Sequence, residues 1–416
     1  MREMNFSGVQ WIGNIPTTWQ MGRIGGLYLL RNEKVSDRDY PPLSVTNKGI
    51  VPQLETAAKS NAHDDRKKVM VGDFAINSRS DRRGSCGISP YEGSVSLINT
   101  ILAPKAEMYP KYYDWLFHTI QFGDEFYKWG HGIVDDLWTT GWQDMKRILI
   151  PLPPLAEQRT IATYLDSRCA EIDAIGADIQ SQIDILEQYR RSIITEAVTN
   201  GLNPDVEKRD SGIEYVGFVP AHWNQHPLYY YFGERKNKNA LGLETNLLSL
   251  SYGRIVRRDI DSSDGLLPQS FNTYNIIEAG DIIIRPTDLQ NDKRSLRTGL
   301  SREHGIITSA YIAMKPLKRI NVAYFHYLLH AFDVMKVFYN MGNGVRQGLN
   351  FSEFSRLMVL EPPIDEQDAI VSELDAKCAE IDAIIEDKKK QLTVIDEYKK
   401  SLIFEYVTGK KEVPAS

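Results

Sequence analysis

The chain has few cysteines and no long apolar run, and these two absences limit the classes of protein to which it can belong. Its 416 residues include three cysteines, Cys86, Cys169 and Cys378, which cannot build a disulfide framework and do not lie at metal-ligand spacing. No apolar stretch approaches the roughly 18 residues of a membrane helix. The first residues also lack the apolar core of a signal peptide. We therefore expect a reduced, cytoplasmic location.

The sequence also lacks the short motifs of common enzyme classes. It contains no Walker-type phosphate loop, no HExxH and no GxSxG. The Asn/Asp-Pro-Pro-Tyr/Phe tetrapeptide of amino-methyltransferases is absent too. Of the eight histidines, His326 and His330 alone have metal-like spacing, and their aromatic-rich surroundings favour core or surface roles. We predict no catalytic residue, no metal site and no cofactor in this chain.

Acidic residues are concentrated in two segments. The formal net charge is −6 in total, yet residues 1–150 carry +1 and residues 211–360 carry +4. Residues 151–210 carry −5 and residues 361–416 carry −6. An acidic total therefore does not exclude local basic faces that bind nucleic acid.

Each acidic segment contains the heptapeptide CAEIDAI, at 169–175 and again at 378–384. This duplication covers the whole chain, and its small changes of offset indicate short loop insertions on one scaffold. Six further pairs occur in the same order at offsets of 204 to 212: WIGNIPTTW with YVGFVPAHW, LSVTNKGIV with LSLSYGRIV, VGDFAIN with AGDIIIR, YYDWLFH with YFHYLLH, GHGIVDDL with GNGVRQGL, and PPLAEQ with PPIDEQ.

Both acidic segments have the pattern of long helices. No proline or strong breaker follows Pro154 before Asn200-Gly201, although Gly176 is a weak point. Apolar residues recur every seven positions, which is typical of a coiled coil. Lys388 interrupts the second column. The columns are Leu165, Ile172, Ile179, Leu186 and Ile193, then Leu374, Ile381, Ile395 and Leu402, with Ile175, Ile183, Tyr189, Ile384, Leu392, Tyr398 and the small Cys169 and Cys378 filling the seam between them.

The order globule–helix–globule–helix predicts an α+β protein. Two similar mixed α/β globular domains are separated by two long antiparallel coiled-coil helices, as a pseudo-two-fold internal repeat. A helix of about 45 residues spans roughly 65–70 Å, which suits a spacer. The alternative is two unrelated helices, each packed on its own globule. The predicted boundaries are 1–150 for the first globule, 151–202 for the first helix, 203–360 for the second globule with a linker at 203–212, and 361–416 for the second helix and tail.

PLPPLAEQRTI before a long heptad helix, with a second PP-x-x-EQ copy half a chain later, resembles the specificity subunit of type I restriction–modification systems. The helix ends EQYRRSIITEAVTNGL and DEYKKSLIFEYVTGK and the stretch GNGVRQGLNFSEF are also similar to that family. The resemblance implies a non-catalytic DNA-binding subunit. Each globule would be a target recognition domain that reads one half of an asymmetric bipartite site in double-stranded DNA.

The resemblance also implies partners and a role for the helices. The helix pair would set the spacer length and dock two methyltransferase subunits, and restriction subunits would complete the complex. S-adenosylmethionine would be bound by the methyltransferase subunits, and ATP and Mg by the restriction subunits. The docking residues implied are Pro153, Pro154, Glu157, Gln158, Pro362, Pro363, Glu366 and Gln367. The alternative for these is helix-start chemistry, because proline and glutamate both stabilise a first turn.

Basic and polar runs follow equivalent strands in both globules, and such residues suit contacts with phosphates and base edges. For each of them the alternative is a solvated loop. The predicted DNA-binding residues are Thr46, Asn47, Lys48, Arg66, Lys67, Lys68, Arg79, Arg82 and Arg83 in the first globule, and Arg254, Arg257, Arg258, Arg285, Lys293, Arg294, Arg297, Asn343, Arg346 and Gln347 in the second.

Two other functions stay open at this point. One is a coiled-coil scaffold that presents two like protein-binding domains. The other is an orphan methyltransferase or a nuclease fusion, which the missing catalytic motifs disfavour. Basic runs at matching places in the two repeats favour DNA binding over the scaffold.

Overall fold

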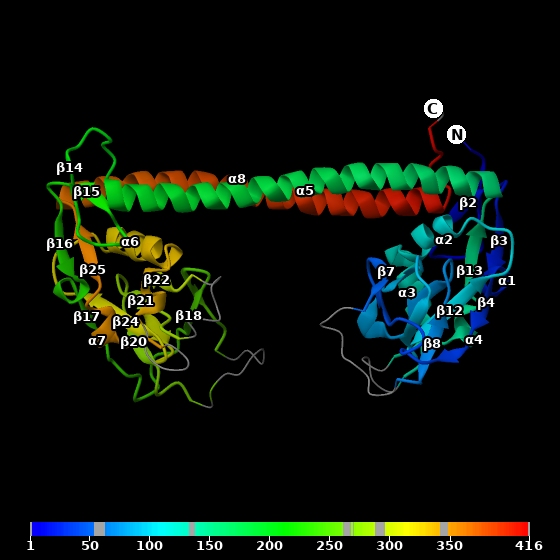
Figure 1. Cartoon of the computed structure of the whole chain (residues 1–416), viewed down its shortest axis with the longest axis horizontal. Helices are drawn as coiled ribbons and strands as arrows, with labels where there is room; N and C mark the ends of the chain where they lie inside the picture. Colours follow the sequence, from blue (N-terminus) through cyan, green and yellow to red (C-terminus); the bar gives the residue numbers. More distant parts are fainter. Residues whose placement is uncertain are drawn as a thin grey trace. The chain divides into compact units, whose positions relative to one another are not determined.

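A computed structural model describes residues 2–53, 63–132, 138–260, 268, 270–287, 296–341 and 348–414. The chain divides into two compact units: Met1–Gln180 with Lys389–Ser416 (unit 1), and Ser181–Lys388 (unit 2). Each unit contains one globule and part of both long helices, α5 (Leu155–Asn200) and α8 (Ile364–Val407) (Figure 1). No helix within the described ranges is long and apolar enough to cross a membrane.

The globule of unit 1 is built from antiparallel strands and short helices. A four-stranded sheet has the order β10-β9-β12-β4, a three-stranded sheet has the order β11-β8-β5, and three pairs, β1-β2, β3-β13 and β6-β7, lie beside them. The strands are β1 (Met4–Phe6), β2 (Asn14–Pro16), β3 (Gln20–Arg23), β4 (Tyr28–Arg31), β5 (Lys34–Val35), β6 (Leu43–Thr46), β7 (Gly49–Pro52), β8 (Arg66–Val69), β9 (Phe74–Asn77), β10 (Cys86–Ile88), β11 (Gly93–Ser96), β12 (Asn99–Pro104) and β13 (Leu149–Leu152). The helices are α1 (Ile24–Leu27), the 3-10 turn η1 (Ser80–Arg82), α2 (Pro110–Phe117), α3 (Ile120–Lys128) and α4 (Trp142–Met145).

The globule of unit 2 repeats this plan. Its four-stranded sheet has the order β17-β24-β21-β22, and the pairs β14-β15, β16-β25, β18-β19 and β20-β23 accompany it. The strands are β14 (Lys208–Asp210), β15 (Phe218–Pro220), β16 (Asn224–Pro227), β17 (Phe232–Glu234), β18 (Leu248–Ser251), β19 (Arg254–Arg257), β20 (Asn275–Ile277), β21 (Ile282–Ile284), β22 (Thr298–Leu300), β23 (Gly305–Ile307), β24 (Ile312–Pro316) and β25 (Met358–Glu361). The helices are η3 (Leu228–Tyr230), α6 (Val322–Val334), η4 (Val337–Asn340) and α7 (Phe351–Phe354).

The repeated Gly-Asp dipeptide forms the same turn in both globules. Asp73 accepts the guanidinium of Arg31 at 2.6 and 3.0 Å, and Asp281 accepts that of Arg235. Each carboxylate also accepts a turn N–H at 2.8 Å. Both are nearly fully buried, and a buried carboxylate without such partners would be strongly destabilising. The turn explains why VGDFAIN and AGDIIIR agree while neighbouring loops do not.

Aromatic side chains form the centre of each globule. Tyr112 and Phe117 of α2 are buried in unit 1, and Tyr324 and Phe325 of α6 are buried in unit 2. Tyr112 donates its hydroxyl to the carbonyl of Val407 at 2.7 Å, and Tyr324 donates to the carbonyl of Val198 at 3.3 Å. Each globule is therefore anchored to a long helix through equivalent side chains.

The two long helices are paired antiparallel inside each unit. In unit 1, Asp173 of α5 pairs with Lys399 of α8, and Tyr164 lies against the later Tyr406. In unit 2, Arg190 likewise pairs with Asp382. The predicted fold class, two similar mixed globules with two long antiparallel helices, is confirmed.

The structure corrects part of the predicted seam. Leu165, Ile172, Ile179, Ile183, Leu374, Ile381 and Leu402 are buried, and Leu186, Ile193, Leu392 and Ile395 are half-buried. By contrast Ile175, Tyr189, Ile384 and Tyr398 are between 40% and 53% exposed. The seam runs through the helix in alternating steps of three and four residues, and each of these four side chains lies one residue before a seam position. The seam positions are occupied instead by Gly176, Arg190, Ile385 and Lys399. These residues lie at multiples of seven residues from Cys169 or Cys378.

Candidate nucleic-acid interface and docking surface

The repeated PP-x-x-EQ motif joins each globule to its helix. Gln158 accepts the backbone N–H of Tyr109 at 2.8 Å and donates to the carbonyl of Pro153 at 2.8 Å. Gln367 accepts the N–H of Asn321 at 3.0 Å and donates to the carbonyl of Pro362 at 2.9 Å. Tyr109 and Asn321 are the N-caps of α2 and α6. In each unit one side-chain amide therefore accepts the N–H at the start of a globule helix and holds that helix start on the long helix.

The rest of the motif has a similar structural role. Pro153, Pro362 and both glutamines are buried, whereas Pro154 and Pro363 are exposed. Glu157 accepts the indole N–H of Trp19 at 2.9 Å, and Glu366 pairs with His222 at 2.8 Å. The buried glutamines have no surface to offer a partner protein. We therefore withdraw Gln158 and Gln367 as docking residues, because their amides are bonded to the starts of the globule helices α2 and α6.

A second contact between globule and helix is also duplicated. Trp115 of α2 donates its indole N–H to Asp166 at 2.9 Å, and Tyr327 of α6 donates its hydroxyl to Asp375 at 2.6 Å. Asp166 directly follows the seam residue Leu165, and Asp375 follows the equivalent Leu374. In a heptad, the residue after this seam position lies on one flank of the helix pair. The globule of each unit therefore contacts this flank.

The predicted DNA-binding residues of the first globule differ in exposure. Asn47 and Lys48 form the exposed turn between β6 and β7. Arg82 and Arg83 are exposed beside η1, where Arg83 pairs with Asp124 at 3.0 Å. These four side chains are accessible to a phosphate backbone. Thr46, Lys67, Lys68 and Arg79 are half-buried.

Two predicted contacts are corrected by their burial. Arg66 is 7% exposed and donates to the hydroxyl and carbonyl oxygens of Ser94 at 2.8 and 3.0 Å. Arg297 is fully buried, and its guanidinium donates to the carbonyl of Thr287 at 2.5 Å. Both guanidinium groups bind the backbone of their own globule. Lys67 is drawn inward too, because its ammonium donates to the carbonyl of Asn99 at 2.7 Å and burial lowers its pKa.

In the second globule, exposed arginines lie on the hairpin β18–β19. Arg254, Arg257 and Arg258 are exposed, and Arg285 is half-buried at the end of β21. Arg257 pairs with Glu303 at 2.6 Å, and the pairing raises the pKa of Arg257. Lys293, Arg294, Asn343, Arg346 and Gln347 lie outside the described residues.

Exposed apolar side chains are duplicated along the long helices. Ile175, Ile185 and Tyr189 on α5 correspond, at an offset of 209, to Ile384, Val394 and Tyr398 on α8. We name these six residues the apolar flank. Ile175, Tyr189, Ile384 and Tyr398 each directly precede a seam residue, which places them on the flank opposite the one that contacts the globule. Each unit carries three of the six. Four of them, Ile175, Tyr189, Ile384 and Tyr398, are the residues that the heptad pattern wrongly assigned to the seam.

Burial shifts the pKa values of two histidines and two cysteines in the structure. Burial lowers the pKa of His326 to about 4 and that of His330 to about 3, so both are neutral at pH 7. Burial raises the pKa of Cys169 to about 11 and also raises that of Cys378, which keeps both thiols protonated. Within the described ranges, no three His, Cys, Asp or Glu residues are placed to hold a metal ion.

Known proteins resemble this chain in sequence at low identity. No protein-family model matches the chain. Two curated relatives are 24% identical: the MjaX specificity subunit of Methanocaldococcus jannaschii, over 65% of this chain and 60% of that protein, and the type I restriction enzyme EcoBI specificity subunit of Escherichia coli, over 63% and 58%. The alignments thus span about three fifths of these two relatives. The MjaVIII specificity subunit of M. jannaschii is 22% identical over 99% of this chain and 97% of its own length.

Two solved structures share the fold. A chain described under complex assembly and conformational transition of the type I R-M system matches with a TM-score of 0.69 at 14% identity, covering 95% of this chain and 99% of that one. The HsdS subunit from Thermoanaerobacter tengcongensis matches with a TM-score of 0.50 at 15% identity, covering 95% and 98%. The chain is similar to type I restriction enzyme specificity subunits, at 22–24% identity, and shares the fold of the HsdS subunit.

Proposed function

We propose that the chain is the non-catalytic DNA specificity subunit of a type I restriction–modification enzyme. Each globule reads one half of an asymmetric bipartite site. One observation carries the proposal: the two units repeat the junctions at Gln158 and Gln367 atom for atom, yet present different side chains on their exposed hairpins. A kept scaffold with altered loops is what two readers of different sequences require.

Accessible basic side chains supply the proposed interface. In the first globule Asn47, Lys48, Arg82 and Arg83 lie on exposed turns, and in the second Arg258 lies on the hairpin β18–β19. Such groups neutralise phosphates, and their amide and guanidinium donors suit base edges in the major groove. Arg257, Arg285, Lys293, Arg294, Asn343, Arg346 and Gln347 stay in the proposal on sequence grounds, whereas Arg66 and Arg297 do not.

The helix pair is proposed to set the number of unread base pairs. Helix α5 has 46 residues and α8 has 44. At 1.5 Å per residue each is roughly 65–70 Å long, which corresponds to about two turns of duplex DNA. Half-sites at a fixed separation must also meet the correct helical phase of the DNA. The helix length is thus a geometric constraint on the site.

The apolar flank is the proposed docking surface for methyltransferase subunits. Tyr189 and Tyr398 are 52% and 49% exposed, and Ile185 and Val394 are more exposed still. Large apolar side chains at equivalent places in both units fit two copies of one partner, because a duplicated surface binds the same protein twice. These partners would supply S-adenosylmethionine, and restriction subunits would supply ATP and Mg.

Selection from random DNA duplexes tests the proposal. The chain is purified with its methyltransferase partner, and bound duplexes are sequenced. We expect enrichment of two short half-sites separated by a fixed unread spacer. A single contiguous motif, or no enriched motif, would contradict the proposal. Affinity that hardly changes with salt would favour the scaffold alternative, since phosphate contacts make binding strongly salt-dependent.

A further inference from the structure

The aspartate of CAEIDAI has different partners in the two units. In unit 1 both carboxylate oxygens of Asp173 accept the ammonium of Lys399, at 2.6 and 2.7 Å. In unit 2 the equivalent Asp382 divides its oxygens between two guanidinium groups: Oδ1 accepts Arg190, the counterpart of Lys399, and Oδ2 accepts Arg254 at 2.6 Å. A third member has thus been added to an otherwise repeated ion pair.

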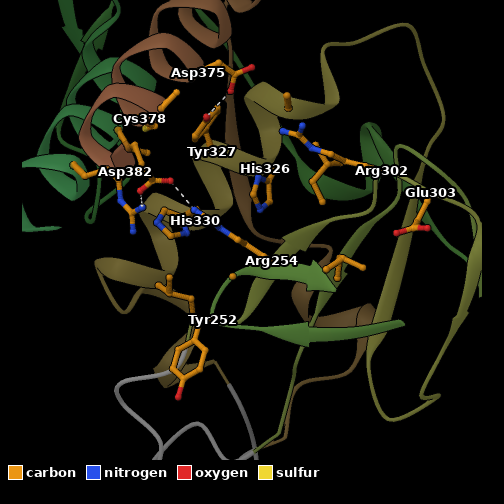
Figure 2. A pocket seen from close by; sticks show the side chains of 18 residues that line it. Tyr252, Arg254, Arg302, Glu303, His326, Tyr327, His330, Asp375, Cys378 and Asp382 are labelled. Carbon is orange, nitrogen blue, oxygen red and sulfur yellow. Dashed lines mark hydrogen bonds and ion pairs between the residues drawn. The ribbon is translucent and has the colours of Figure 1, made fainter. Parts of the chain in front are cut away.

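Arg254 comes from the globule, at the tip of the hairpin β18–β19. A two-residue turn of Tyr252 and Gly253 connects the strands, with φ of +46° and +79°. Positive φ at both turn residues gives the tight hairpin whose twist matches the strands. Arg254 is therefore the first residue of the returning strand, at the end of the hairpin that contacts the helix pair. Figure 2 shows its side chain directed at Asp382.

The hairpin of unit 1 cannot make this contact. Its turn, between β6 and β7, has the same length, and Gly49 occupies the position equivalent to Arg254. A glycine has no side chain with which to reach Asp173. Both hairpins lie on the equivalent strand of their globule: Gly49 lies on Gly87 of β10, and Leu250 and Ile255 lie on Gly299 of β22. The first hairpin therefore offers no side chain at the position from which Arg254 reaches the helix pair.

A cleft separates the hairpin of unit 2 from the helices. It has a volume of about 720 Å³ and is lined by Tyr252, Arg254, His326, Tyr327, Asp375 and Asp382 among others (Figure 2). The hairpin is packed on the globule through Leu250 and Ile255, and open space lies between its tip and α6 and α8. On the globule side the tip lies against Leu296 and the backbone of Thr298, and on the other side the pair Arg254–Asp382 bridges the space to the helix pair.

We propose that Arg254, Asp382 and Arg190 form a tether that fixes the second recognition hairpin to the helix pair, whereas Gly49 at the equivalent position of the first hairpin cannot form it. Arg254 is then a positioning residue and not a phosphate contact. This inference rests on the proposed function, in which the helix pair sets the spacer. The tether holds the second hairpin at a fixed position on the helix pair. The second half-site is therefore recognised only at a fixed distance from the first.

Two matched variants test the tether without DNA. Asp382→Asn weakens the helix–helix pair and the tether, whereas Asp173→Asn weakens only the equivalent helix–helix pair. Hydrogen exchange of the hairpin amides should speed up by about two- to five-fold in Asp382→Asn at residues 248–257, as for the loss of one partly exposed ion pair. Exchange at residues 43–52 should not change in Asp173→Asn. Arg254→Gln should reproduce the first result, and Arg254→Lys should restore protection in part.

Spacer selectivity tests the consequence. In complexes with the methyltransferase partner, affinity is compared between the preferred site and sites with one base pair more or fewer in the spacer. Arg254→Gln and Asp382→Asn should lower this ratio by about two- to five-fold, and Asp173→Asn should leave it unchanged. Arg258→Gln, a proposed phosphate contact, should weaken binding to all spacers by one factor.

The outcomes separate the two proposals. Uniform weakening at all spacers by Arg254→Gln, with unchanged hairpin exchange, would show that Arg254 is an ordinary phosphate contact and would overturn the tether. Equal exchange changes in Asp382→Asn and Asp173→Asn would overturn it as well. A wild-type complex without any bipartite preference would overturn the proposed function, while the exchange experiment would still decide the tether.

Discussion

At the scale of a residue, Gln158 and Gln367 each use one buried side-chain amide to connect a globule helix to a long helix. Each accepts the first N–H of a globule helix and donates to a proline carbonyl, and each is nearly inaccessible. Without the amide, the buried proline carbonyl and the partly buried N–H would each lose this partner, and such groups are costly to leave unsatisfied. The residue pattern suggested docking because a motif kept in both repeats has either a structural or a binding role, and letters alone do not distinguish them.

Replacing either glutamine by alanine should destabilise its own unit. We expect Gln158→Ala and Gln367→Ala each to lower the free energy of unfolding by about 1–3 kcal/mol, because each leaves one buried acceptor and one partly buried donor without this partner. Urea unfolding measures the change. Gln188→Ala, on an exposed face of α5, is the control and should change stability by less than about 0.5 kcal/mol. Losses no larger than that of the control would show that the junction does not depend on the amide.

His326 and His330 predict a stability change with pH. Burial holds their pKa values at about 4 and about 3, below the ordinary value near 6.5, and Arg302, Arg190 and Arg191 act in the same direction. Between about pH 6.5 and pH 4 the unfolded chain binds protons that the folded chain does not. Stability therefore falls as the pH drops through that window, by up to about 1.4 kcal/mol per pH unit for each histidine.

Replacing both histidines with glutamine separates their contribution from that of the carboxylates. Unfolding midpoints are compared at pH 7 and pH 5. The wild-type chain should lose more stability on acidification than the double variant. Equal losses in the two proteins would mean that these rings are not held neutral by burial.

At the scale of elements, the heptad period located both long helices and their partner positions. The period is strong because a seam of two helices repeats every 3.5 residues over the entire length. The individual seam residues were harder to assign, since Ile175 and Tyr189 are apolar and only one position from the seam. Likewise the run Arg66–Lys68 has the composition of a basic loop, but it belongs to strand β8, in which Arg66 is buried against Ser94.

The apolar flank predicts a stoichiometry. Tyr189→Glu should remove one methyltransferase subunit from the complex, Tyr398→Glu should remove the other, and the double variant should bind neither, because a charge placed in an apolar interface is strongly unfavourable. Native mass spectrometry counts the bound subunits. Gln188→Glu, which adds the same charge at a neighbouring exposed position outside the flank, should leave two. Two subunits bound to the double variant would place docking elsewhere.

At the scale of the whole molecule, some parts of the duplicated sequence are the same in both copies and other parts differ. The parts that agree best, CAEIDAI and PP-x-x-EQ, lie where a helix and a globule or two helices must fit together. In the aligned hairpins LSVTNKGIV and LSLSYGRIV the strand ends agree and the turns differ, including Gly49 against Arg254. Sequence comparison within one chain could therefore predict the architecture, but not which basic side chains point outward, since that depends on burial in each globule.

The central claim is that the helix pair sets the distance between two half-sites, and shortening the pair tests it most directly. Removing residues 178–184 together with 387–393 takes one heptad from each helix and keeps the seam in phase. Selection from random duplexes should then return both wild-type half-sites with a spacer shorter by about three base pairs, since seven residues rise by roughly 10 Å and a base pair by roughly 3.4 Å. Full-affinity binding to the original spacer would contradict the account.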